Sequence, residues 1–375
     1  MASPLLYTYA AAGAICAFLL YFLAPVARRI GLVDRPSGRK QQLQPVPLIG
    51  GIAVTASFFL GALLMPIPFA QYRVLFFCVA VLFITGVVDD LRELPPSAKF
   101  IAQLAVVLIL VFIDGQVVRF IGDILNWGGP DDPQALGLAF LAVPLTVFAM
   151  IGVINAFNLI DGLDGLCAGV TLIAIAALMW LAFHHDGVAT TAISEFKLLG
   201  LIFVIVLVFL IFNLPFLAGT RRQVYLGDAG SMVLGLIMVY FFIDLSQRGV
   251  PIATSGNPII KSPSAPWLIA LPLMDTVNVT MHRLRSGRSP LRPDRTHIHH
   301  LLLDNGVNRY AVLAILLALQ LFCSTVGVLG THQSWPESIL FWSMLPGYLC
   351  FAFATWALAR RRRTLKRRHS SRHQC

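Results

Sequence analysis

The chain has 375 residues, of which 57% are apolar and only 12% charged, and it carries 28 Lys and Arg against 18 Asp and Glu. Soluble domains contain roughly 25% charged residues, so this composition excludes an ordinary soluble enzyme. The six cysteines are far apart and mostly inside apolar stretches, which indicates core packing and argues against a disulfide framework or a cysteine metal site.

Apolar segments of membrane-spanning length recur along the whole chain. The first begins at Leu5 after an uncharged start and is about 20 residues long, so we interpret it as a span and not as a cleaved signal peptide. The pattern predicts an all-α fold, a polytopic integral membrane helical bundle of about 11 transmembrane helices. The segments are 5–24, 48–69, 73–88, 98–113, 136–157, 166–183, 197–212, 229–245, 264–281, 309–330 and 337–358.

Positive charges are distributed unevenly between the two sets of connecting segments. If the N-terminus is outside, the inner segments hold 23 of the 28 Lys and Arg residues, which is the bias that the positive-inside rule predicts. We therefore expect the C-terminus inside. Residues 1–358 would form one catalytic membrane domain, and residues 359–375 a basic cytoplasmic tail that anchors the topology and attracts anionic lipid.

Two adjacent carboxylates, Asp89 and Asp90, end the third apolar segment and precede Lys99. At the edge of a low-dielectric slab, repulsion between neighbouring carboxylates raises the pKa of one of them unless a cation lies between them. Lys99 or a divalent metal ion could supply that cation. The alternative is a solvated helix end without a chemical role.

The second polar group runs from Asn158 to Gly165 and joins two apolar segments. Asn158, Asp161 and Asp164 recur every three residues, which predicts three polar side chains along one helical face. Gly162 and Gly165 either break the helix or let a substrate approach its backbone. A loop without function would more often use Ser or Lys here, so this segment is a candidate site.

The third group combines Asn213 with the sequence Gly-Asp-Ala-Gly-Ser at residues 227–231, which opens the eighth apolar segment. A carboxylate followed by small residues at a helix N-terminus could hold a metal ion or orient a phosphate, because free backbone N–H groups point outward there. Asp228 could instead cap the helix, and both roles could coexist.

The fourth group lies in the longest inner loop and contains three histidines within four residues. Histidine clusters suggest zinc, but the neighbouring arginines would repel a cation and no cysteine is near. Arg and His donors facing a diphosphate fit better, and a plain basic interface loop is the remaining alternative. The group comprises Asp275, His282, Arg283, Arg285, Arg288, Arg292, Arg295, His297, His299 and His300.

All four groups map to the inner face, which predicts an active-site cleft on the cytoplasmic side. Several carboxylates, a cationic loop and apolar walls suit a reaction between a water-borne polyphosphate and a lipid-borne acceptor. Mg²⁺ fits this inventory because it typically takes one or two carboxylates plus substrate phosphates. A membrane transporter is the competing class, but it would place charged residues near the bilayer midplane in broken helices.

Five stretches, in order, resemble the polyprenyl-phosphate N-acetylhexosamine-1-phosphate transferase superfamily (glycosyltransferase family 4), and the resemblance covers about residues 30 to 330. The His-Ile-His-His form is similar to the branch that makes undecaprenyl-diphospho-N-acetylglucosamine. The branch that transfers phospho-MurNAc-pentapeptide tends to show three consecutive histidines followed by Phe-Glu. The stretches are 47–51, Asp89 and Asp90 with Lys99, 158–165, Asn213 with 227–231, and 297–300.

The resemblance implies a bacterial inner-membrane enzyme that transfers N-acetylglucosamine 1-phosphate from UDP-N-acetylglucosamine to undecaprenyl phosphate and releases UMP. This would be the first lipid-linked step of a surface polysaccharide of the O-antigen type. Mg²⁺, or alternatively Mn²⁺, would be the cofactor. The partners would be the two substrates and membrane lipid, with no nucleic acid and with a homodimer left open.

The same resemblance implies roles for individual residues. Asp89 would take a proton from the lipid phosphate, Asp90 and Asp228 would hold the metal, and Lys99 would neutralise phosphate. Substrate-binding roles would fall to Asn158, Asp161, Asp164 and Asn213 around the nucleotide, to His299 and His300 at the diphosphate, and to Arg295 and His297.

Two positions depart from the family pattern. Gln42 to Gln44 stand where relatives often carry a His-x-Gly sequence, and Glu93 stands where a third Asp is common. The sequence also leaves the sugar open, because relatives accept N-acetylgalactosamine, fucosamine or quinovosamine derivatives, or phospho-MurNAc-pentapeptide.

Overall fold

A computed structural model describes residues 4–34, 45–126, 136–185, 193–219, 222–247, 258–289 and 296–372. This part of the chain is built from helices and one pair of two-residue antiparallel strands, in which Val33 faces Pro47 and Asp34 faces Val46. The elements are α1 (Pro4–Ile30), β1 (Val33–Asp34), β2 (Val46–Pro47), α2 (Gly50–Leu63), α3 (Phe69–Arg92), α4 (Pro96–Phe112), η1 (Ala139–Leu141), α5 (Ala142–Ile160), α6 (Leu166–His184), α8 (Ile193–Asn213), α9 (Pro215–Ala218), α10 (Gly227–Gln247), η2 (Ser262–Ser264), α11 (Ala265–Leu268), α12 (Ala270–Arg285), α13 (Ile298–Asp304), α14 (Arg309–His332) and α15 (Glu337–Arg372).

The predicted all-α membrane bundle is confirmed. Within the described ranges, eight helices are long and apolar enough to cross a membrane, and α2 and α4 are shorter apolar helices. Every predicted segment overlaps a helix or, for 264–281, a group of short helices. The chain is therefore a multi-pass membrane protein, and the number of eleven spans stays a prediction.

The segment predicted at 264–281 is broken between α11 and α12. Pro272 has no N–H group to donate to the carbonyl of Leu268 four residues earlier. Gln320 of α14 uses this carbonyl, since its Nε2 donates to Leu268 O over 2.8 Å. The carbonyl of Leu268 therefore keeps a hydrogen-bond partner although the helix breaks at Ile269.

Helix α10 lies at the centre of the bundle and packs most extensively against α3 and α5. In the apolar 18-residue stretch of α10, 94% is buried inside the protein, whereas the buried share of the corresponding stretch of α15 is 17%. Its first turn is approached closely by glycines of two other helices. A Cβ atom on Gly51 would lie 2.3 Å from Gly230 N, and one on Gly86 would lie 2.3 Å from the Cα atom of Ala229.

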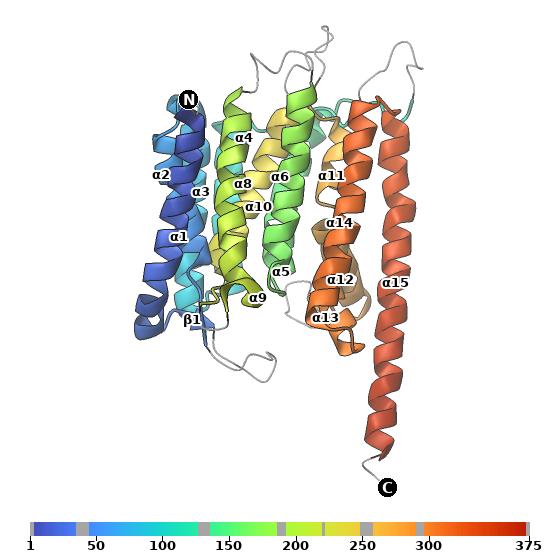
Figure 1. Ribbon diagram of the computed structural model, residues 1–375. Helices are drawn as coiled ribbons and strands as arrows, with labels where there is room; N and C mark the ends of the chain where they lie inside the picture. The colour runs from blue at the N-terminus through green and yellow to red at the C-terminus, as the bar shows by residue number, and fades with distance from the viewer. Residues whose placement is uncertain are drawn as a thin grey trace.

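The long helices stand side by side, and the two chain termini lie at opposite ends of the bundle (Figure 1). The end that contains the C-terminus also contains β1, α9 and α13, which flank the polar groups of the sequence. Helix α15 continues well beyond this end without a break at residue 358, where the sequence analysis divides membrane domain from basic tail. That division stays a prediction.

Gly86→Ala should test the contact between α3 and the first turn of α10. The added methyl group overlaps backbone atoms that cannot rotate away, so we expect the free energy of unfolding to fall by about 1–3 kcal/mol. Gly152→Ala on α5 is the matched control, because a Cβ atom there meets nothing within 4 Å. That change should raise helix stability by up to about 1 kcal/mol. Thermal unfolding in detergent measures both, and equal shifts would contradict the packing argument.

Candidate functional site

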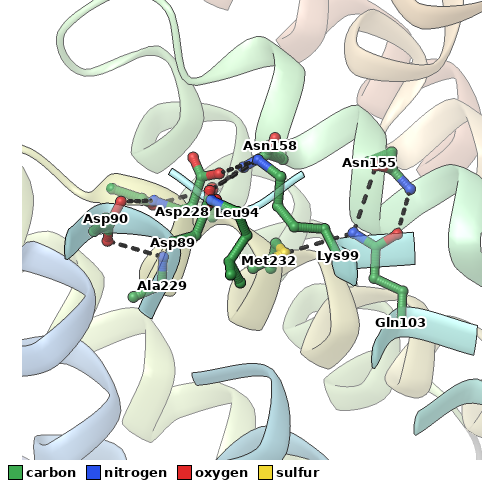
Figure 2. Close-up of polar contacts among 12 residues, drawn as sticks. Asp89, Asp90, Leu94, Lys99, Gln103, Asn155, Asn158, Asp228, Ala229 and Met232 are labelled. Carbon is green, nitrogen blue, oxygen red and sulfur yellow. Dashed lines mark hydrogen bonds and ion pairs between the residues drawn. The ribbon is translucent and has the colours of Figure 1, made fainter. Parts of the chain in front are cut away.

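Lys99 joins two carboxylates from different helices at the centre of the site. Its Nζ atom donates to Asp89 Oδ2 over 2.8 Å and to Asp228 Oδ2 over 2.9 Å, as Figure 2 shows. The Asp89 side chain is 8% exposed, whereas those of Lys99 and Asp228 are 27% and 30% exposed. The lysine and Asp228 can therefore be reached from solvent, while Asp89 lies behind them.

A tight turn between α3 and α4 places Asp89 beside Lys99. Glu93 ends α3 in the left-handed conformation, and Pro96 begins α4 at a position where a missing N–H group costs nothing. Asp89 Oδ1 accepts a hydrogen bond from Leu94 N over 2.7 Å and so fastens this turn. Of the two adjacent carboxylates that the sequence analysis expects around a cation, Asp89 pairs with Lys99, and the second partner of Lys99 is Asp228 and not Asp90.

Asp90 caps the N-terminus of α10. Its Oδ1 accepts from Asp228 N over 2.9 Å and its Oδ2 from Ala229 N over 3.3 Å. Gly227 has φ 72°, and a Cβ atom there would lie 2.5 Å from Asp90 Oδ2, so this position requires glycine. The alternative in which Asp228 is the cap is wrong, because the cap comes from α3 and leaves the Asp228 carboxylate directed at Lys99.

Asn158 lies in the last turn of α5 and faces the first turn of α10. Its Nδ2 donates to Ser231 Oγ over 3.0 Å, and Ser231 Oγ donates to Gly227 O over 3.1 Å. The structure thus brings Asn158 against the turn that carries Asp228, as the sequence predicts for one shared site.

The predicted single helical face of three polar residues is wrong. Helix α5 ends at Ile160, so only Asn158 is helical, and Asp161 and Asp164 lie in the turn before α6. Gly165 has φ 79° and caps the start of α6, a left-handed conformation that glycine adopts readily. Burial raises the pKa of Asp161, and the negative charges of Asp228, Asp164 and Asp90 raise this pKa further.

Asp164 and Asn213 connect this turn to the segment before α10. Asp164 Oδ2 accepts from Gln223 Nε2 over 2.8 Å and pairs with Arg309 Nη1 at 3.1 Å. Asn213 Oδ1 accepts from Gly165 N over 2.6 Å, and its Nδ2 donates to Val224 O over 2.9 Å. The sequence analysis missed Gln223 and Arg309, because a single polar residue in a loop carries no spacing signal.

The histidine group is held by an acid on α12. His297 Nδ1 donates to Asp275 Oδ2 over 2.8 Å, and Asp275 Oδ1 accepts from Ile298 N over 2.9 Å. His299 lies against the turn after α5, since a Cβ atom on Gly162 would lie 2.3 Å from His299 Nε2. The rings of His299 and His300 are 4.2 Å apart between centroids. The second and fourth polar groups therefore form one site.

Two other predictions fall outside the described residues. Arg295 and the segment from Gln42 to Gln44 belong to the stretches that the structure does not describe. The role that the sequence analysis assigns to Arg295 stays a prediction.

The acidic residues of the site are candidate ligands of a divalent metal ion. Among the described residues, no three His, Cys, Asp or Glu side chains converge as a closed metal cage. Mg²⁺ typically takes one or two carboxylates and completes its shell with water and phosphate. Asp228 is accessible, and the charges of Asp228, Asp164 and Asp90 raise the pKa of Asp161, which shows that several carboxylates lie close together. These are oxygen donors of the kind that Mg²⁺ prefers.

Residues 72–246 match the family described as glycosyl transferase family 4. The chain is similar to proteins named undecaprenyl-phosphate alpha-N-acetylglucosaminyl 1-phosphate transferase. The protein of Escherichia coli O157:H7 is 34% identical over 358 residues, which cover 93% of this chain and 91% of the relative. That of Yersinia pestis is 31% identical over 93% of this chain and 92% of its own. That of Haemophilus influenzae is 33% identical over 94% and 95%.

Asp90→Ala should destabilise the fold through the first turn of α10. Two helix N–H groups would lose their acceptor, at a cost of about 1–3 kcal/mol, whereas Asp90→Asn keeps one acceptor oxygen and should lose less. Glu93→Ala, an exposed change three residues further on, is the control. The unfolding temperature in detergent should be highest for the control, lower for Asp90→Asn and lowest for Asp90→Ala. Identical stabilities of Asp90→Ala and the control would show that Asp90 is no cap.

Proposed function

Because the chain belongs to glycosyl transferase family 4, we propose that it transfers N-acetylglucosamine 1-phosphate from UDP-N-acetylglucosamine to undecaprenyl phosphate. The products are undecaprenyl-diphospho-N-acetylglucosamine and UMP. The similarity to the named transferases extends over 93% of the chain and supports this reaction. The structural observation that carries the proposal is Lys99 between Asp89 and Asp228 at one end of a membrane bundle.

The reaction is a displacement at phosphorus. An oxygen of the lipid phosphate attacks the sugar-linked β-phosphorus of the UDP-sugar, and the bond from that phosphorus to the bridging oxygen breaks as UMP leaves. A phosphate monoester has a second pKa of about 6, so the acceptor is largely a dianion at neutral pH. A covalent enzyme intermediate would add little, and the protein's task is to hold two anions together.

Lys99 is suited to that task. An ammonium group has three donors, and Asp89 and Asp228 accept only two of them. The third donor can meet a phosphate oxygen without breaking either ion pair. Asp89, which is nearly buried beside Lys99, would complete deprotonation of the acceptor and orient it.

Asp228 and Asp90 would hold Mg²⁺ in this proposal. A carboxylate has about four lone-pair sites, so Asp90 keeps acceptor capacity after it has accepted the two N–H groups of α10. When bound, the ion would neutralise charge on the phosphates during the displacement. His297, fixed by Asp275, would orient the histidine group toward the diphosphate.

The placement of the charged groups favours an enzyme over a transporter. The carboxylates of the site lie in the last turn of α3, the turn after α5 and the first turn of α10, where helices end. A transporter that binds its cargo at the midplane would have such groups in the middle of broken helices.

The proposal predicts that purified protein forms labelled lipid from UDP-N-acetylglucosamine only when undecaprenyl phosphate is present, with one UMP released for each lipid product. UDP-N-acetylgalactosamine and UDP-MurNAc-pentapeptide, assayed in parallel, test the choice of sugar. Faster turnover of either competitor would replace N-acetylglucosamine in the proposal. UMP release that does not depend on acceptor would overturn the transfer reaction itself.

Asp228→Asn should reduce kcat at least ~10³-fold, the scale of lost charge stabilisation at a transferring phosphoryl group. The protein should stay folded, because Asp90 and not Asp228 caps α10. Glu93→Gln, which neutralises an exposed acid just after α3 at the same end of the bundle, is the control and should retain activity. Near-normal turnover of folded Asp228→Asn protein would remove Asp228 from the chemistry.

We further propose that the N-terminus is outside and that the C-terminus and the site are cytoplasmic. The distribution of Lys and Arg supports this orientation, and so does the position of the termini at opposite ends of the bundle (Figure 1). Reporter fusions after Arg363 and near Asp131 should report the inner and the outer side, respectively. Fusions that report the same side would contradict the proposed topology.

A further inference from the structure

Two neutral amides face each other inside the bundle, next to the site. Asn155 Nδ2 donates to Gln103 Oε1 over 2.7 Å, and Gln103 Nε2 lies 3.5 Å from Asn155 Oδ1, so each side chain donates to the other (Figure 2). Gln103 is 2% exposed. None of the roles proposed above uses this pair.

The pair is placed one turn away from residues of the site. Gln103 follows Lys99 by four residues on α4, and Asn155 precedes Asn158 by three residues on α5. Residues at these spacings share a helix face. The amide pair therefore joins the face of α4 that carries Lys99 to the face of α5 that carries Asn158.

The pair also reaches the third helix of the site. Gln103 Nε2 lies 3.5 Å from the Sδ atom of Met232, which is four residues after Asp228 on α10. Asn155 Nδ2 additionally donates to Ile151 O of its own helix over 2.8 Å, which fixes the direction of its amide. One pair of side chains thus relates the helices that carry Lys99, Asn158 and Asp228.

A hydrogen-bonded pair restricts helix position more tightly than an apolar pair would. An amide inside an apolar span is costly without a partner, so α4 cannot rotate or slide relative to α5 without losing hydrogen bonds. Apolar side chains would associate the same helices by packing, which tolerates small shifts. Lys99 lies in the first turn of α4, where a shift of the helix moves its ammonium group away from the carboxylates.

We infer that Gln103 and Asn155 are positioning residues that set the register of α4 against α5 and so hold Lys99 between Asp89 and Asp228. The inference rests on the proposed transferase reaction. It assigns no contact with substrate to either amide. Loss of the pair should therefore affect turnover through the position of Lys99.

The test is turnover of UDP-N-acetylglucosamine with undecaprenyl phosphate by purified variants. For the double variant Gln103→Leu/Asn155→Leu we expect kcat to fall ~10²-fold, which is the scale of a 1 Å misplacement of a reacting group. Replacement of both partners by apolar groups of similar size is close to neutral for stability, so thermal unfolding should stay near that of the wild type. KM for the UDP-sugar should change much less than kcat.

Two further comparisons separate positioning from a structural role. The exchanged pair Gln103→Asn/Asn155→Gln keeps two amides of the same total length and should recover most of kcat. In a Lys99→Arg background, the double leucine change should lower kcat little further. The pair acts by positioning the Lys99 ammonium group, and that group is already absent there. A pair with only a structural role would lower kcat by the same factor in both backgrounds.

Thr146→Val is the matched control on the same helix. Thr146 is buried in α5 and accepts from Val118 N over 2.9 Å, far from the site. The Thr146→Val change should lower the unfolding temperature and leave kcat of the folded protein unchanged.

Wild-type kcat in the double leucine variant would overturn the positioning role. Absence of transfer by the wild type would instead overturn the proposed function, so the two failures are distinguishable.

Discussion

The site depends on one constraint, which is that the first turn of α10 is a helix N-terminus enclosed by protein. Asp90, on a different helix, accepts two of its N–H groups. Gly51 and Gly86 let α2 and α3 come against the same turn. These contacts determine where the backbone of Asp228 lies, and the hydrogen bond from Lys99 then holds its carboxylate.

The parts of this arrangement that are local in the chain could be predicted from the sequence. Asp89 and Lys99 are ten residues apart around a Pro-Pro turn, so their pairing follows from the end of one apolar segment and the start of the next. The membrane bundle follows in the same way from segment length and composition. Even the break at Ile269 had a signal, since Pro272 lies inside the predicted segment and cannot complete a helix turn.

The parts that join distant segments could not be predicted. The hydrogen bond from Asp228 N to Asp90 spans 138 residues, and an N-cap pattern searches only the residues next to the helix. The three-residue spacing of Asn158, Asp161 and Asp164 suggested one helix, whereas α5 ends at Ile160 and Gly165 caps the start of α6. Gln103 and Asn155 are uncharged and lie inside apolar segments, and only the packing of α4 against α5 brings them together.

Helix α15 connects the histidine group of the site to the bilayer. Its 36 residues extend roughly 54 Å, whereas a hydrocarbon core is about 30 Å thick, so the helix must project from the membrane. Arg362 pairs with Asp304 at 2.8 Å and Asn305 Nδ2 donates to Leu358 O over 3.0 Å, which ties α13 and its histidines to this projecting part. Long helices respond to bilayer thickness by tilting. A change in the tilt of α15 would therefore be transmitted by these contacts to the helix that carries His299 and His300.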